Sequence, residues 1–165
     1  MCRNSISKRM YEYLSNHVIE VESREAILIE EYYKENVEES IAVEDFFTEY
    51  TKGINNFLHT ISIDEDNSDY CPIVIIGSTV EVQDLDDMQI YKYRIVYPYS
   101  EHTDKNIDYA SCMSPLGKAI LLKSVNHQAN IKIPAGTLHY IIKSVTVEEH
   151  LFSEPIIEKE LKIRA

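Results

Sequence analysis

The chain has 165 residues, of which 44% are hydrophobic and 27% charged, a globular composition that allows one ordinary domain or two small ones. Its formal net charge of −12 repels phosphate backbones, so direct sequence-specific binding of nucleic acid is not expected. A strongly acidic surface suits a basic groove on a protein partner, or metal ions. The need for solubility explains the acidic charge equally well.

The cysteines at positions 2, 71 and 112 share no metal-ligand or redox spacing, which indicates reduced thiols. The first residues lead into a polar helix instead of an apolar signal core, and no segment approaches the ~20 apolar residues that span a bilayer. The six histidines are scattered without metal-like spacing. The sequence therefore predicts a cytoplasmic protein with no membrane association.

Residues 1–62 are predicted to form an antiparallel helical hairpin, because apolar residues recur at alternating steps of three and four, as in a coiled-coil seam. The first series, interrupted at Glu25, is Leu14, Val18, Val21, Leu28 and Tyr32. The second series is Val43, Phe47, Tyr50, Ile54, Phe57 and Ile61. Antiparallel arms would then pair Tyr32 with Phe47, Leu28 with Tyr50 and Val21 with Phe57.

The tip of this hairpin is expected near residues 36–41, because Glu35 to Ser40 contribute no seam residue. Ser40 is expected to cap the second helix. That arm of ~20 residues would reach ~30 Å at 1.5 Å per residue. The alternative is that both helices pack on the following sheet as ordinary core.

A polar, acidic connector at residues 63–72 is expected to separate the hairpin from a second domain at residues 73–165. This domain is predicted to be a small antiparallel sheet with one helix, so the chain is α+β. The expected strands are 73–83, 90–96, one that includes Ile107 and Tyr109, and a hairpin of 131–134 with 138–147. Ser114 would cap a helix that Pro115 opens and that ends at Leu122. Residues 148–165 are expected to be a charged tail in which Ile156, Ile157 and Leu161 give one short amphipathic helical face.

Five segments of the second domain follow one another at specific spacings: Gly77 to Val82, Asp84-Leu85-Asp86, Tyr93-Arg94-Ile95-Val96, Ser114 to Leu121, and Ile133-Pro134-Ala135-Gly136. In this order they resemble the C-terminal, FKBP-like domain of the Gre transcript-cleavage factors, over residues 75–147. Val96-Tyr97-Pro98 and the polar loop from Ser100 to Asn106 look like the Rnk-type regulators, which share this domain but have a much shorter hairpin.

The resemblance implies a bacterial transcription factor that binds RNA polymerase. The C-terminal domain would dock at the rim of the polymerase secondary channel, and the coiled coil would enter the channel. The segment that matches the family's docking element supplies the candidate polymerase-binding residues Ser114, Pro115, Leu116, Gly117 and Lys118. No cofactor of its own is expected, at most a Mg²⁺ shared with the polymerase active site.

In Gre factors an Asp and, three residues later, a Glu at the hairpin tip help to hold that Mg²⁺ for RNA cleavage. Lys34-Glu35-Asn36 matches this motif and makes Glu35 the candidate Mg²⁺ ligand, whereas Tyr32 stands at the Asp position. The nearby carboxylates that could replace the Asp are Glu31, Glu38 and Glu39. A solvated helix end explains these glutamates equally well.

The missing Asp favours a non-enzymatic regulator that competes for the secondary channel with weak or no cleavage stimulation, because one carboxylate leaves most of the Mg²⁺ coordination to water. The first alternative is an active cleavage factor that uses Glu35 and a neighbouring Glu. The second is an FKBP-type peptidyl-prolyl isomerase, which would need an aromatic-lined apolar pocket.

Overall fold

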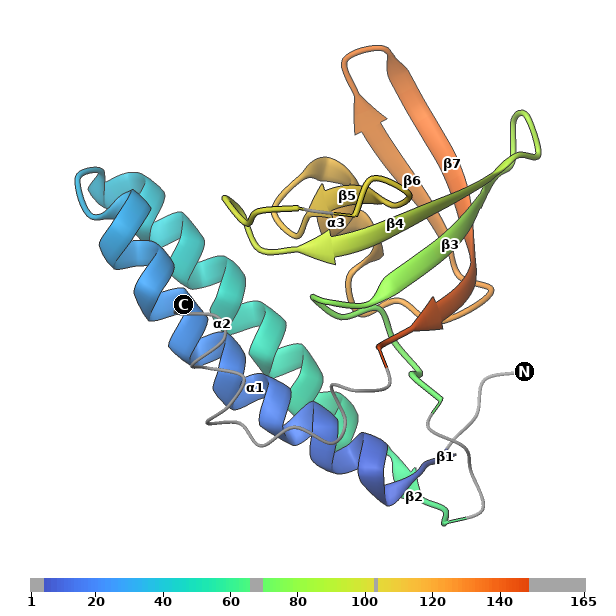
Figure 1. The fold of residues 1–165 in the computed structure, drawn as a ribbon, viewed down its shortest axis with the longest axis horizontal. Helices are drawn as coiled ribbons and strands as arrows, with labels where there is room; N and C mark the ends of the chain where they lie inside the picture. Colours follow the sequence, from blue (N-terminus) through green and yellow to red (C-terminus); the bar gives the residue numbers. More distant parts are fainter. Residues whose placement is uncertain (1–4, 66–69, 103, 149–165) are drawn as a thin grey trace. The chain divides into compact units, whose positions relative to one another are not determined.

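The computed structural model describes residues 5–65, 70–102 and 104–148, which fall into two compact units divided along the chain between residues 69 and 70 (Figure 1). The first unit is a helical hairpin and the second is a sheet with one helix, so the predicted α+β class is confirmed. The helical face expected in the tail falls on residues 149–165, outside the described residues. In the described parts, no helix is long and apolar enough to cross a membrane.

The helical unit consists of α1 (Lys8–Leu28), the π-helical segment η1 (Ile29–Tyr33) and α2 (Val37–Thr60), with α1 and α2 antiparallel (Figure 1). The Ser7 side chain caps α1, because its Oγ accepts a hydrogen bond from the Met10 backbone N–H at 3.1 Å. The strands β1 (Ser5–Ile6) and β2 (Ser62–Ile63) pair in parallel at the open end. Ile63, expected in the connector, therefore belongs to the base of the hairpin.

The core of the hairpin follows most of the predicted seam. Its fully buried members are Leu14, Val21, Leu28, Phe47 and Ile54. His17 Nε2 and Tyr50 Oη form a buried hydrogen bond of 2.8 Å between α1 and α2. In the last turn of α2, Leu58 is buried, whereas the predicted seam residue Phe57 is only half-buried.

Tyr32 does not belong to the seam, contrary to the sequence prediction, because its side chain is 48% exposed. The cause is η1, in which hydrogen bonds run from residue i to i+5 and each turn holds more residues than an α-helical turn. The inward position after Leu28 therefore moves one residue along the chain, to the half-buried Tyr33. A periodicity of 3.6 residues cannot anticipate this local unwinding.

The second unit contains β3 (Thr79–Asp84), β4 (Ile90–Val96), β5 (Asp108–Ser111), α3 (Pro115–Ile120), β6 (Gln128–Ile133) and β7 (Gly136–Thr146). The strand order is β5-β4-β3-β7-β6, and β4 pairs with β5 in parallel while the other neighbours are antiparallel. The prediction of an antiparallel sheet was therefore wrong for β5. The loop between Val96 and Asp108 is long enough to return the chain to the start of β4 before β5 begins.

The first strand of this unit starts later than expected. Residues 73–76 are buried, but β3 begins only at Thr79, after a turn in which Ser78 Oγ accepts a hydrogen bond from the Ile75 N–H at 3.1 Å. Gly77 has a φ of +95°, which residues with a side chain rarely adopt. Cys71 and Cys112 are buried, and burial raises the pKa of both thiols to about 12, so both remain protonated thiols at neutral pH.

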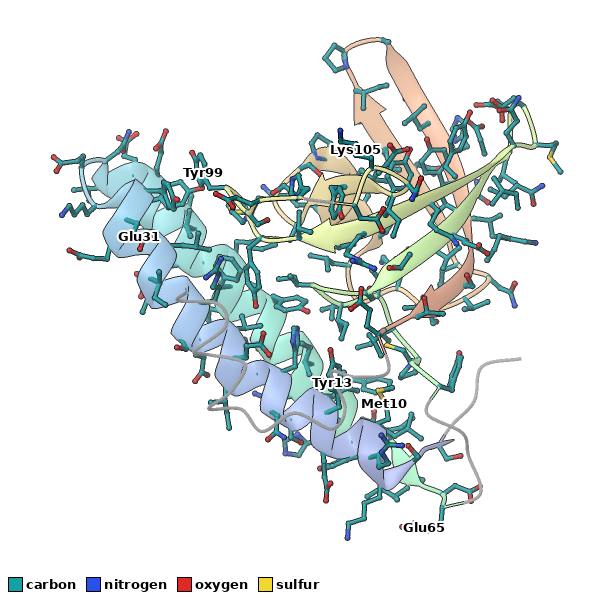
Figure 2. All side chains as sticks on the ribbon, viewed as in Figure 1. Met10, Tyr13, Glu31, Glu65, Tyr99 and Lys105 are labelled. Atoms are coloured by element: carbon teal, nitrogen blue, oxygen red, sulfur yellow. The ribbon has the colours of Figure 1, made fainter. Side chains whose placement is uncertain are left out.

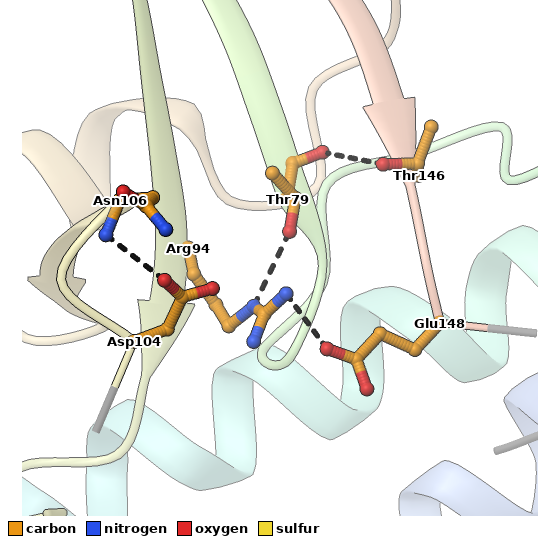
Figure 3. A network of polar contacts seen from close by, with 6 residues as sticks. All are labelled: Thr79, Arg94, Asp104, Asn106, Thr146 and Glu148. Atoms are coloured by element: carbon orange, nitrogen blue, oxygen red, sulfur yellow. Dashed lines mark hydrogen bonds and ion pairs between the residues drawn. The ribbon is translucent and has the colours of Figure 1, made fainter. Parts of the chain in front are cut away.

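A polar network ties the end of β7 to the central strands (Figure 3). Arg94 on β4 donates from Nε to Thr79 Oγ1 on β3 at 3.3 Å, and its Nη2 lies 2.8 Å from Glu148 Oε1. Thr146 Oγ1 donates to the Thr79 carbonyl at 3.4 Å. The arginine of the Tyr93-Arg94-Ile95-Val96 segment therefore has a structural role, because it joins β4 to β3 and to the residues that follow β7.

Candidate functional site

The closed end of the hairpin carries the candidate tip carboxylates, and Figure 2 labels Glu31 there. Glu31 lies in η1, Glu35 in the turn between η1 and α2, and Glu38 and Glu39 in the first turn of α2. All four side chains are exposed. In the described parts of the chain, no group of three or more His, Cys, Asp or Glu is arranged to hold a metal ion. The tip therefore offers separate carboxylates and not a preformed metal centre.

The residue that caps α2 is Asn36, whereas the sequence predicts Ser40 as the cap. Asn36 Oδ1 accepts a hydrogen bond from the Glu39 backbone N–H at 3.1 Å, and Ser40 lies inside the helix. Asn36 follows a turn that its own N–H closes by bonding to the Tyr33 carbonyl at 3.2 Å. Glu38 and Glu39 then lie at the positive end of the helix dipole, which stabilises their charges.

The tip also carries one weak ion pair between exposed side chains. Lys34 Nζ lies 3.4 Å from Glu30 Oε1, and both side chains are exposed, so the pair contributes little to stability. The segment from residue 30 to 39 holds five glutamates and this single lysine. The tip is therefore strongly anionic.

Further along the hairpin, Glu25 interrupts the seam and is half-buried. Burial is the main cause that raises the pKa of its carboxyl group, followed by the neighbouring carboxylates of Glu44 and Glu22. The folded-state pKa then lies above that of the unfolded chain. This group stabilises the hairpin most in acid, and its contribution is lost as the pH rises through the folded pKa.

The five candidate polymerase-binding residues surround the start of α3. Ser114 Oγ accepts from the Gly117 N–H at 3.0 Å and donates to the Ser111 carbonyl at 2.7 Å, so it caps α3 as predicted. Pro115 occupies the first turn, where a missing N–H costs nothing. The helix ends at Ile120, two residues earlier than expected.

Gly117 is buried where α3 crosses the chain that follows β5. A Cβ at this position would lie 2.1 Å from the Ser111 carbonyl oxygen and 2.9 Å from Cys112 Cα, both backbone atoms. Ser114 and Gly117 thus build the turn. Pro115 and Lys118 are exposed and Leu116 is half-buried, so these three can offer side chains to a partner.

Sequence reasoning missed two apolar residues at the tip. Val37 is 71% exposed and Ile41 52% exposed, and both lie on α2. The sequence signal for them is their spacing of four residues outside the seam. This spacing puts two apolar side chains on one face at the polar start of α2.

Comparison with known proteins finds similarity in the second unit of the chain. Residues 70–147 match the family described as "Transcription elongation factor, GreA/GreB, C-term". The chain is 37% identical over 76 residues to the transcription elongation factor GreA of Chlorobaculum parvum, covering 46% of each chain. It is 35% identical over 72 residues to GreB of Xanthomonas axonopodis pv. citri, covering 44% of this chain and 42% of that one. The matches thus span less than half of these relatives.

Among solved structures, the chain is similar to GreA factor homolog 1 (Gfh1) of Thermus thermophilus, with 20% identity and a TM-score of 0.40. The alignment covers 86% of this chain and 97% of that protein. A similarity at this level supports no conclusion about activity.

Proposed function

We propose that this chain is a bacterial regulator that binds RNA polymerase at the secondary channel, because residues 70–147 match the C-terminal family of the GreA/GreB transcription elongation factors. The C-terminal unit docks outside the channel and the hairpin enters it. The observation that carries this proposal is the family match together with a complete Ser114 to Lys118 turn. Such a factor acts in the cytoplasm, where the polymerase is.

The protein has weak or no power to stimulate transcript cleavage. Support comes from the tip, where the resemblance to Gre factors puts the first acid at position 32 and this chain has a tyrosine. Glu35 is then a single exposed carboxylate, which is a poor Mg²⁺ ligand set by itself. The factor competes with cleavage factors for the channel, and any cleavage chemistry belongs to the polymerase.

The alternative is an active cleavage factor, favoured by the exposed glutamates at the tip. Glu31, Glu38 and Glu39 lie within four residues of Glu35 along the chain, and each side chain is exposed. A second acid supplied from this set would complete the pair. The cleavage assay below separates the two functions.

We expect the wild-type protein to bind stalled elongation complexes and displace a cleavage factor, yet to leave the rate of RNA 3′-end cleavage at that of polymerase alone. The physical reason is the missing second carboxylate. The measurement compares wild type, Glu35→Ala and Tyr32→Asp at saturating protein. Tyr32→Asp restores the acid pair at an exposed position, so it removes no buried aromatic side chain. Strong cleavage by the wild type that Glu35→Ala abolishes would establish the active factor instead.

The docking turn is tested at Lys118, because this exposed side chain can be changed without removing the α3 cap. Lys118→Glu should lower the affinity of the full chain for core polymerase roughly tenfold, since it reverses a charge at the interface. Lys143→Glu, an equal charge change at an exposed position of β7, should alter the affinity by no more than about twofold. Equal affinities of the two variants would exclude α3 from the interface.

A further inference from the structure

The closed end of the hairpin has no buried side chain of its own. Leu28 and Val43 are each 2% exposed, and none of residues 29–42 between them, all of which the structure describes, is buried. The segment η1 therefore contains no buried residue either. Segments with few buried apolar contacts rearrange locally at a low free-energy cost. A change in the helical register of η1 would thus break no tight side-chain packing.

Two adjacent tyrosines can each occupy the inward position at this end. Tyr32 lies four residues after Leu28 in the chain, and Tyr33 lies five residues after it. An α-helix brings residues i and i+4 onto one face, whereas the wider π-helical turn joins residues i and i+5. In the observed π-helical register Tyr33 is half-buried and Tyr32 is 48% exposed. An α-helical register would exchange the two residues and put the same kind of side chain in the seam.

The two registers are balanced by opposing local effects. Each buries a similar apolar area, because both exchanged side chains are tyrosines. The α-helical register restores the common hydrogen-bond geometry, since π-helical turns are rare. It also lengthens the turn before Asn36 from two residues, Lys34 and Glu35, to three that begin at Tyr33. The hydrogen bond of 3.2 Å from the Asn36 N–H to the Tyr33 carbonyl, which closes the observed turn, would then be lost.

The start of α2 does not depend on the register of η1. Asn36 Oδ1 accepts from the Glu39 N–H at 3.1 Å, and the Asn36 carbonyl accepts from the Ser40 N–H at 2.9 Å. Both hydrogen bonds lie within residues 36–40, on the α2 side of the turn. A change of register is therefore confined to residues 29–35, while α1 and α2 keep their pairing.

We propose that η1 is a register switch, which exchanges between the observed π-helical register with Tyr33 inward and an α-helical register with Tyr32 inward. The second register is populated at roughly 1–10%, as in other two-state segments. The exchange changes the length of the acidic turn by one residue and changes which tyrosine the hairpin exposes. A molecule that contacts either tyrosine would select one register. This inference goes beyond the proposed function, because it concerns the hairpin in the absence of any partner.

The test observes the full-length chain in solution by NMR relaxation dispersion, which reports exchange on the μs–ms timescale. In the wild type we expect exchange at the amides of residues 29–35 and none at those of residues 44–54. Tyr33→Lys puts a charge at the inward position of the π-helical register, so it should favour the α-helical register. A 3-fluorotyrosine at position 32 should then become roughly threefold or more protected from a dissolved paramagnetic agent. The matched control is Tyr32→Lys, which should remove the exchange and leave Tyr33 as protected as in the wild type.

A deletion variant distinguishes a change of register from opening of the closed end. Deletion of Glu31 puts Tyr33 four residues after Leu28, so a regular α-helix then places Tyr33 inward and keeps the two-residue turn. We expect this variant to stay folded by circular dichroism and to lose the exchange. Absence of exchange in the wild type, or unchanged exchange in the deletion variant, would overturn the inference. A Tyr33→Lys variant in which position 32 stays as exposed as in the wild type would also overturn it. None of these results bears on the proposed function, because the assay contains no polymerase.

Discussion

Gly117→Ala is expected to destabilise the C-terminal unit by at least about 3 kcal/mol, although alanine is the better helix former. Helix propensity alone would favour alanine by about 1 kcal/mol. The added Cβ, however, would lie 2.1 Å from the Ser111 carbonyl oxygen, and the atoms around it are backbone atoms that cannot rotate away. Either α3 or the end of β5 must therefore move, which disturbs the Ser114 cap as well.

Urea unfolding and hydrogen exchange of β5, α3 and β6 would measure this loss. Ala119→Gly in the same helix is the control, because it makes the opposite exchange, and its cost of about 1 kcal/mol reports helix propensity. A Gly117→Ala variant as stable as the wild type would mean that α3 does not approach the backbone this closely. Loss of polymerase binding by Gly117→Ala alone would be no evidence for direct contact, since the whole turn would have moved.

Phe47→Ala should destabilise the helical hairpin by about 3–5 kcal/mol, the usual cost of removing a fully buried phenylalanine. Phe47 is 0% exposed and lies on α2 among the residues that face α1. The cavity would open in the core of the hairpin, where the Phe47 side chain is the largest that is fully buried. The C-terminal unit should keep its stability, because its buried residues belong to the sheet and α3.

Residue-resolved hydrogen exchange distinguishes loss of the hairpin alone from loss of both units. Amides of α1 and α2 should lose protection in Phe47→Ala, while those of β3, β4 and β7 should not change. Phe46→Ala is the matched control: Phe46 adjoins Phe47, with ring centroids 5.1 Å apart, but it is only half-buried, so it should cost at most about 2 kcal/mol. Loss of protection in both units together would contradict separate cores.

Phe47→Ala and Gly117→Ala are expected to impair different functions of the protein. A loosened hairpin leaves the docking turn intact, so Phe47→Ala should still bind polymerase through the C-terminal unit, but should compete less well with a cleavage factor. Gly117→Ala should lose docking while the helical hairpin keeps its structure. The pair of variants therefore assigns affinity and competition to separate units of the chain.

Much of the candidate site followed from local sequence. The start of α3 could be predicted because Ser114 and Pro115 satisfy a helix terminus by themselves, and both arms of the hairpin could be predicted from regularly spaced apolar residues. The order of five short segments indicated the C-terminal domain of the Gre family, and residues 70–147 match the model of that domain. The spacing of Val37 and Ile41 is visible in the sequence, but their exposure depends on which face of α2 packs against α1.

The sequence by itself thus determined where helices and most strands form, since periodicity and caps depend on residues a few positions apart. The tertiary structure alone decided three features: the parallel pairing of β5, the outward rotation of Tyr32 by η1, and the close approach of Gly117 to Ser111. Each depends on how one segment meets another. The pairing of β5 depends on where the long loop before it returns to the sheet. The π-helical turn of η1 shifts the inward position by one residue. The missing Cβ of Gly117 matters only because a neighbouring backbone lies against it.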